Sequence, residues 1–194
     1  MSIWDERYRT AEFIYGKEPN CFFAEQLQKL PIGKILLPAE GEGRNAVYAA
    51  KKGWDVTAID SSFVAKEKAL AFAQAENVTI DYQIQSIEEY CFPQNEFDAV
   101  ALIYAHQKNH ENLHRNCINS LKKGGTILLE AFSKQQIHYS SGGPGDVNLL
   151  YSIDELMYDF KDLFDLTIWE EDVQLNEGKG HAGMAHVIRL IGKK

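Results

Sequence analysis

The sequence predicts an α/β protein with a doubly wound sheet and helices on both faces. Three observations lead to this prediction: short apolar runs alternate with helical patterns, a glycine pair follows the first run, and two further apolar runs close the chain. Alternation of this kind is typical of parallel strands joined by right-handed crossovers. We expect about seven strands, mostly parallel with an antiparallel last strand, in a single domain spanning residues 1–194.

Seven segments have the composition of strands. Residues 97–104 (FDAVALIY) are almost continuously apolar, as expected for a strand buried on both faces of a parallel sheet. Residues 79–84 alternate between apolar and polar side chains, which predicts an edge strand. The predicted strands are residues 34–38, 55–59, 79–84, 97–104, 126–131, 166–169 and 187–191.

Helical patterns fill the intervals between most of these strands. We expect the third helix to end at Gly124, because Lys122 and Lys123 suit the negative carboxyl end of a helix. Ser152 and Glu155 have the spacing of a capping box, which predicts the start of the last helix. The predicted helices cover residues 44–52, 61–76, about 111–123, and a segment that begins after Ser152.

Two segments outside this alternation are expected to cover the ligand site. Residues 1–30 form a helical and aromatic cap, in which Trp4 and Tyr8 are four residues apart on one helical face. An amphipathic helix that merely covers the core is the more common alternative. Residues 133–151 are long, polar and rich in glycine around Pro144, which predicts a lid loop.

Composition and charge argue against several classes of protein. The net charge of -8 disfavours binding to nucleic acid, which depends on a basic face. No window approaches the roughly 18 consecutive apolar residues of a membrane span, and no signal peptide is evident, so we expect a cytoplasmic protein. Cys21, Cys91 and Cys117 are widely spaced, which fits neither a disulfide framework nor a metal site. We therefore expect no bound metal.

A ligand site is expected beyond the carboxyl ends of the strands, where doubly wound sheets bind their ligands. The chain segments that leave these strand ends should converge on one cleft. These segments are residues 39–45, 60–61, 86–87, 104–107, and the chain from residue 132 onward.

The stretch LPAEGEGRNA follows the first strand and carries the glycine pair. Gly41 and Gly43 allow close backbone approach, and the helix after them offers N–H groups to a carboxylate or phosphate. An ordinary strand-to-helix turn explains such a pair equally well. Asp60 ends the second strand, where a carboxylate can accept both ribose hydroxyls, although a helix N-cap is the alternative. Together they favour an adenosine-containing cofactor, either NAD or S-adenosylmethionine (SAM).

The closing strands favour SAM, because a dinucleotide needs a second mononucleotide-binding half that this chain lacks. The run LPAEGEGRNAVYAAKKGWDVTAID resembles motif I and the acidic strand end of class I SAM-dependent methyltransferases. Further blocks resemble a small bacterial branch that includes the tellurite-resistance and thiopurine methyltransferases. These blocks are WDERY, YGKEPN, EFDAVALIYAH, LKKGGTILLEAF, SSGGPGDVNLLYSIDEL and EGKGHAGMAHVIRLI.

This resemblance covers essentially the whole chain and implies a Rossmann-like fold with SAM as cofactor and S-adenosylhomocysteine as product. The implied reaction is methyl transfer to a heteroatom of a small molecule, with a soft sulfur, selenium or tellurium nucleophile favoured. The implied partners are a small-molecule acceptor, with no nucleic acid and no membrane, and the protein is expected to be a monomer or homodimer.

The resemblance also implies which residues hold SAM. Gly41 and Gly43 would pack against its amino-acid end, and Arg44 would meet its carboxylate. Asp60 would hold the ribose, while the sulfur would lie near Tyr104. The implied cofactor-binding residues are Ala39, Glu40, Gly41, Gly43, Arg44, Asn45, Asp60, Ser61, Ser86, Ile87 and Tyr104.

The sequence departs from the family pattern at several of these positions. Leu37 stands where many relatives have aspartate, and Ala39 and Glu40 replace a Gly-Cys pair. Ser86 replaces the acidic residue expected beside adenine. A SAM-binding module without catalysis is therefore one alternative function, and an NAD(P)-dependent reductase is another.

His106 directly follows the fourth strand and is our candidate for a general base or a substrate contact. The alternative is a hydrogen-bonded histidine in the wall of the cleft. His110, His114 and His186 are expected to be structural or exposed. The candidate substrate-binding residues are Trp4, Tyr8, Tyr15, His138, Tyr139 and His181.

Overall fold

A seven-stranded sheet organises residues 3–194, the part of the chain that this computed structural model describes. The strand order is β3-β2-β1-β4-β5-β7-β6, with the first five strands parallel and β7 antiparallel to both of its neighbours. This arrangement confirms the predicted fold class, with β3 at an edge. The strands are β1 Lys34–Pro38, β2 Asp55–Asp60, β3 Asp81–Ile84, β4 Phe97–Ile103, β5 Leu121–Phe132, β6 Phe164–Glu177 and β7 His181–Lys193.

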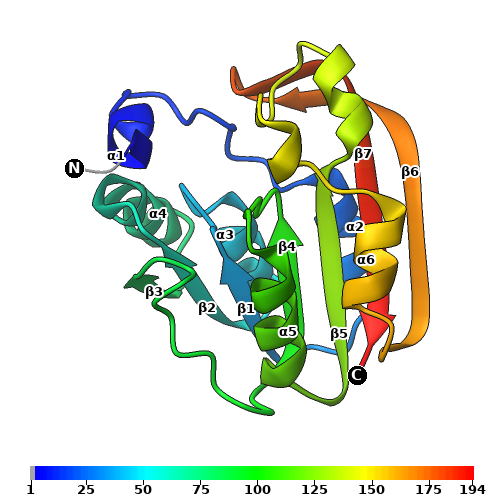
Figure 1. The fold of residues 1–194 in the computed structure, drawn as a ribbon. Helices are drawn as coiled ribbons and strands as arrows, with labels where there is room; N and C mark the ends of the chain where they lie inside the picture. Colours follow the sequence, from blue (N-terminus) through cyan, green and yellow to red (C-terminus); the bar gives the residue numbers. More distant parts are fainter. Residues whose placement is uncertain (1–2) are drawn as a thin grey trace.

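Helices cover both faces of the sheet, as a doubly wound fold requires (Figure 1). α2, α3 and α4 pack on one face, and α5 and α6 pack on the other. Alternate residues of β1 serve the two cores, since Ile35 and Leu37 join the first cluster and Leu36 joins the second. The helices are α1 Ile3–Tyr8, α2 Cys21–Leu27, α3 Arg44–Lys51, α4 Phe63–Ala75, α5 His110–Ser120 and α6 Ile153–Asp159, with short 3-10 helices η1 Lys134–His138 and η2 Val147–Leu149.

The capping box predicted for the last helix is present at α6. The Ser152 hydroxyl accepts from the backbone N–H of Glu155, and the Glu155 carboxylate accepts from the backbone N–H of Ser152 at 2.9 Å. Two otherwise unpaired backbone donors are satisfied by this exchange. The start of α6 therefore follows from two side chains three residues apart.

The predicted end of α5 at Gly124 is wrong, because this helix ends at Ser120. Leu121 is fully buried and extended, and it pairs with Phe97 at the start of the β4–β5 ladder. The side chain of Lys122 bonds Asp98 at 2.8 Å instead of lying at a helix terminus. Burial of one leucine in the sheet thus outweighs the local signals for a longer helix.

The two closing strands are much longer than the apolar runs that predicted them. β6 and β7 pair in register from Thr167 with Ile191 to Glu177 with His181, forming a long antiparallel ribbon. Most side chains of β6 are partly or fully exposed, so the apolar pattern marks only part of the strand. The extra length matters because it carries the turn between the two strands to the carboxyl-end edge of the parallel strands.

Three covering segments gather at that edge of the sheet (Figure 1). They are α1 with the chain that follows it, the segment 133–151, and the turn between β6 and β7.

Residues 1 and 2 of the predicted cap 1–30 lie outside the described residues. Among residues 3–194, no helix has the length and apolar character needed to cross a membrane.

We predict that Gly43→Ala destabilises the fold more than Gly124→Ala. Both glycines have a positive φ, so alanine is strained at either position. A Cβ at Gly43 would lie 2.6 Å from the Cβ of Ala69 on α4, whereas a Cβ at Gly124 would meet no atom of the described residues within 4 Å. Urea unfolding should show a loss of about 1 kcal/mol for Gly124→Ala and at least about 2 kcal/mol for Gly43→Ala. Equal losses would contradict the tight packing of α3 on α4.

Candidate functional site

A cavity of about 770 Å³ lies where the strand ends, α1, the segment 133–151 and the β6–β7 turn meet. This volume is within the range of small-molecule sites. The cavity is lined by all the predicted cofactor-binding residues except Gly41 and Gly43, and by most of the predicted substrate-binding residues. The predicted residues in its wall are Trp4, Tyr8, Tyr15, Ala39, Glu40, Arg44, Asn45, Asp60, Ser61, Ser86, Ile87, Tyr104, His106 and His181.

Gly41 and Gly43 are not among the residues that line the cavity, and their contact with the amino-acid end of SAM stays a prediction. A Cβ at Gly41 would lie 2.7 Å from the hydroxyl of Tyr8, and one at Gly43 would collide with Ala69. These glycines therefore make room for α1 and α4. The strained backbone that does line the cavity belongs to Ala39 and Tyr104, whose φ angles are 55° and 54°. Strain of this kind is typical of ligand sites.

Asp60 is held rigidly at the end of β2. Its carboxylate accepts from the backbone N–H of Gly41 at 3.0 Å and from that of Ser62 at 2.9 Å. Burial raises the pKa of Asp60, while these backbone bonds act to lower it. The carboxylate is therefore fixed between the glycine loop and the start of α4, with its remaining acceptor capacity on the cavity side.

Glu40 is a buried carboxyl group at the amino end of α3. Its Oε1 accepts from the backbone N–H of Ala46 at 2.7 Å, which satisfies one free donor of the helix. Burial raises the pKa of Glu40 to about 7, although the bond from Ala46 and the charge of Arg44 oppose the shift. A cation that enters the cavity would favour the ionised form of this group.

Arg44 is paired within the protein. Its guanidinium donates to Glu177 Oε2 at 3.0 Å and to the backbone oxygen of Tyr15 at 3.3 Å, and less than a tenth of either charged side chain is exposed. Burial acts to raise the pKa of Glu177, but the hydrogen bond from His181 and the charge of Arg44 hold it at about 2. To bind a ligand carboxylate as predicted, the Arg44 guanidinium would have to make that contact while it stays paired with Glu177.

A buried network continues from this ion pair. The side-chain amide of Asn20 donates to Glu177 Oε1 at 3.0 Å and to Glu130 Oε1 at 2.5 Å. The Tyr104 hydroxyl also donates to Glu130 Oε1, and Arg189 donates to Glu130 Oε2 at 2.6 Å. The network was not predicted from the sequence, where the available signal was one acidic residue, Glu130, inside an apolar strand.

His181 lies at the centre of an aromatic part of the cavity wall. Its ring centroid is 4.5 Å from those of Tyr15 and Tyr104 and 5.1 Å from that of Phe132. Nδ1 bonds Glu177 Oε2 at 3.2 Å, which leaves Nε2 as an acceptor when the ring is neutral. Burial lowers the pKa of His181, and the bond to Glu177 opposes that shift. The ring is therefore neutral at pH 7 and can accept a proton.

His106 has both ring nitrogens occupied by the backbone. Nδ1 donates to the carbonyl oxygen of Leu149 at 2.6 Å, and Nε2 accepts from the N–H of Phe132 at 3.2 Å. Burial lowers the pKa of His106 to about 4. This geometry favours the alternative interpretation of His106, a wall histidine that holds the segment 133–151 to the end of β5.

Two of the predicted substrate residues lie away from the cavity wall. His138 is exposed at the end of η1, and the Tyr139 hydroxyl bonds Asp172 at 2.6 Å. Other wall residues were not predicted, among them Arg7, Ile14 and Lys179. Lys179 lies in the β6–β7 turn. Because β7 is antiparallel to both β5 and β6, the carboxyl ends of β5 and β6 lie at the same edge of the sheet, and this direction of β6 is the signal that could have placed Lys179 at the cavity.

Comparisons with known proteins agree with this geometry. Residues 35–125 match the family model of the methyltransferase domain. The ubiquinone biosynthesis O-methyltransferase of Xanthomonas campestris pv. campestris is 26% identical over 152 residues, covering 75% of this chain and 64% of that protein.

Solved structures share the fold at low identity. The structure described as "Conversion of a Disulfide Bond into a Thioacetal Group during Echinomycin Biosynthesis" has a TM-score of 0.74 at 19% identity and covers 99% of this chain and 92% of its own. Phosphoethanolamine N-methyltransferase 2 of Haemonchus contortus, in complex with SAM, has a TM-score of 0.69 at 15% identity, with coverages of 98% and 56%. These likenesses establish the fold, and the bacterial branch suggested by the sequence stays a prediction.

We predict that Glu40→Gln stabilises the protein at pH 8 and has little effect at pH 5. The folded protein keeps the proton of Glu40 up to a pKa of about 7, whereas the unfolded chain releases it near 4.5. Stability is therefore lost as the pH rises from 4.5 through 7, by about 2–3 kcal/mol, and glutamine avoids that loss. Thermal unfolding at both pH values measures the difference. The exposed Glu67→Gln is the matched control, and a pH-independent effect of Glu40→Gln would contradict the assignment.

Proposed function

Because this chain carries a class I SAM-dependent methyltransferase domain, we propose that it transfers the methyl group of SAM to a heteroatom of a small molecule. A soft sulfur, selenium or tellurium nucleophile is the favoured acceptor. The observation that carries this proposal is the aromatic end of the cavity, where a neutral His181 is oriented by Glu177. The cavity is a size that suits a cofactor with a small acceptor.

The residues at the other end of the cavity fit SAM. Asp60 offers a fixed carboxylate to the ribose hydroxyls, and Ser86 and Ile87 would lie beside the adenine. Glu40 offers a carboxyl group whose ionised form is favoured by the positive charge of the ligand. When bound, SAM supplies an activated methyl group on a sulfonium, so the protein need only position the acceptor and accept its proton.

The rings of Tyr15, Tyr104 and Phe132 form an apolar, polarisable surface around His181. Such a surface favours a soft or cationic group over a strongly hydrated one. Orientation of the acceptor can contribute about 7–11 kcal/mol to the rate enhancement. His181 Nε2 would take the proton from a thiol or selenol, while Glu177 holds the ring in the required tautomer.

An oxygen acceptor is the second candidate, because the curated relative is an O-methyltransferase. The same histidine would serve a phenol, whose oxygen also loses a proton on methylation. Turnover of small thiols and catechols under identical conditions distinguishes the two acceptor classes.

Asp60→Asn is predicted to weaken S-adenosylhomocysteine binding by about ten- to a hundredfold, because the ribose hydroxyls lose a charged acceptor. Asp55→Asn is the matched control, since Asp55 lies at the opposite, exposed end of the same strand. Titration calorimetry of both folded variants measures the effect. Equal affinities for the two variants would remove Asp60 from the cofactor site.

His181→Gln is predicted to lower the rate with a thiol acceptor at pH 7 by about 10²–10⁴-fold, while S-adenosylhomocysteine binding is retained. The loss should shrink as the pH rises through the thiol pKa of about 8.5, because the acceptor then ionises by itself. His106→Gln should show no such pH-dependent recovery. A constant loss for His181→Gln across this pH range would indicate a packing role instead of proton transfer.

A further inference from the structure

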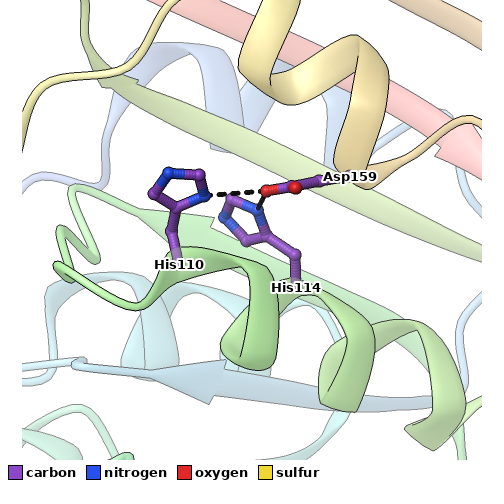
Figure 2. A group of neighbouring side chains, drawn as sticks. All are labelled: His110, His114 and Asp159. Atoms are coloured by element: carbon purple, nitrogen blue, oxygen red, sulfur yellow. Dashed lines mark hydrogen bonds and ion pairs between the residues drawn. The ribbon is translucent and has the colours of Figure 1, made fainter.

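Three side chains behind the cavity wall converge on one point (Figure 2). His110 and His114 are one helical turn apart on α5, and Asp159 is the last residue of α6. Nδ1 of His110 lies 2.8 Å and Nδ1 of His114 lies 2.6 Å from the same Asp159 Oδ2. Figure 2 shows both rings turned toward that carboxylate. None of the three lines the cavity described above.

We propose that His110, His114 and Asp159 form a binding site for a divalent first-row transition metal ion of the Zn²⁺ type. Two imidazole nitrogens and one carboxylate oxygen are a donor set that suits such an ion, and leave a position for water. The site is independent of the methyl-transfer proposal.

The geometry needs only a small adjustment to hold the ion. The three ligand atoms lie within 4.8 Å of one another. Around a tetrahedral ion with bonds of about 2.0–2.2 Å, ligand atoms lie about 3.4 Å apart. The carboxylate therefore has to withdraw by less than about 1 Å from each ring, and the two imidazole nitrogens, which lie within 4.8 Å of each other, have to take up the same spacing. His110 is the partly exposed member of the group, at 14% of its side chain, and provides the entry path.

The charge of the cluster favours a cation. The side chain of Asp159 is only 2% exposed, and its Oδ2 lies within hydrogen-bond distance of both imidazole rings. A bound cation would neutralise this buried carboxylate.

The second nitrogen of His114 points to the same conclusion. Within the part of the chain that the structure describes, Nε2 has no hydrogen-bond partner, although the side chain is completely buried. Because Nδ1–H donates to Asp159, Nε2 carries the lone pair of the ring, and no N–H or O–H group of the described residues donates to it. A metal ion bound at Nδ1 requires the other tautomer of the ring, in which Nδ1 has the lone pair and Nε2 carries the proton. That N–H would lie among the rings of Phe160 and Tyr151, which accept weak hydrogen bonds.

The position of the site assigns it a structural role. The ring of Tyr151 lies 5.1 Å from that of His110, and its hydroxyl donates to the carbonyl oxygen of Ala105 and accepts from the backbone N–H of Gln107, a residue of the cavity wall. A metal ion would join α5 to α6 and hold Tyr151 between them. Its removal should lower the stability of this corner of the fold without removing any atom from the cavity.

The test is metal binding by tag-free protein that has been stripped with a chelator. We expect one Zn²⁺ per chain and a rise of about 5–10 °C in the unfolding midpoint at a Zn²⁺ concentration a hundred times the dissociation constant. Mg²⁺, which avoids nitrogen ligands, should have no effect. Co²⁺ should give visible ligand-field absorption without the ultraviolet charge-transfer band of a thiolate.

Asp159→Asn and His110→Gln should each weaken Zn²⁺ binding at least tenfold. His138→Gln and Cys91→Ser are matched controls on exposed side chains and should bind as the unmodified protein does. Either of two results would overturn the proposal: no stoichiometric Zn²⁺ or Co²⁺ binding by the unmodified protein, or equal binding by the site variants and the controls. The titration of the unmodified protein decides the matter even if a site variant fails to fold.

Discussion

The buried ion pair between Arg44 and Glu177 connects the two halves of this protein. Arg44 begins α3 beside the glycine loop, and Glu177 ends β6 at the turn of the closing ribbon. Breaking a buried pair by removing one partner typically costs about 3–5 kcal/mol, because the other charge is left without compensation. The ion pair therefore joins the start of α3 to the β6–β7 turn region that carries His181.

The hydrogen bonds around the ion pair extend this constraint to the aromatic end of the cavity. Glu177 holds the His181 ring by Nδ1, and Asn20 links Glu177 to Glu130, which accepts from the Tyr104 hydroxyl. Asn20, Glu130, Glu177 and Arg44 each have hydrogen-bond partners in this network, which is the condition under which such a network specifies one arrangement. The same set of bonds that stabilises the β6–β7 ribbon thus sets the tautomer of His181 in the cavity wall.

Local signals and topology were sufficient to predict much of the fold and of the cavity wall. β4 is buried on both faces and reads as an apolar run, and the capping box at Ser152 is made by side chains three residues apart. Asp60 could be placed because strand ends converge in a doubly wound sheet. The end of α5 could not be predicted, because Leu121 joins the sheet and its burial there outweighs the helical pattern.

Contacts between distant segments account for what the sequence did not reveal. Glu177 lies 133 residues from Arg44, and Asp159 lies 45 residues from His114, so neither partner is marked by spacing. The sequence also could not show which of His106 and His181 keeps a ring nitrogen available. Only the structure distinguishes a ring bonded to the backbone at both nitrogens from one that keeps a nitrogen available.

Titration calorimetry of the unmodified protein with S-adenosylhomocysteine, with NADH as the parallel control, is the direct test of whether the cavity between the glycine loop and the β6–β7 turn binds SAM. Saturable binding of S-adenosylhomocysteine at one site per chain, with no heat from NADH, is the predicted result. Binding of NADH without S-adenosylhomocysteine, or of neither ligand, would contradict it.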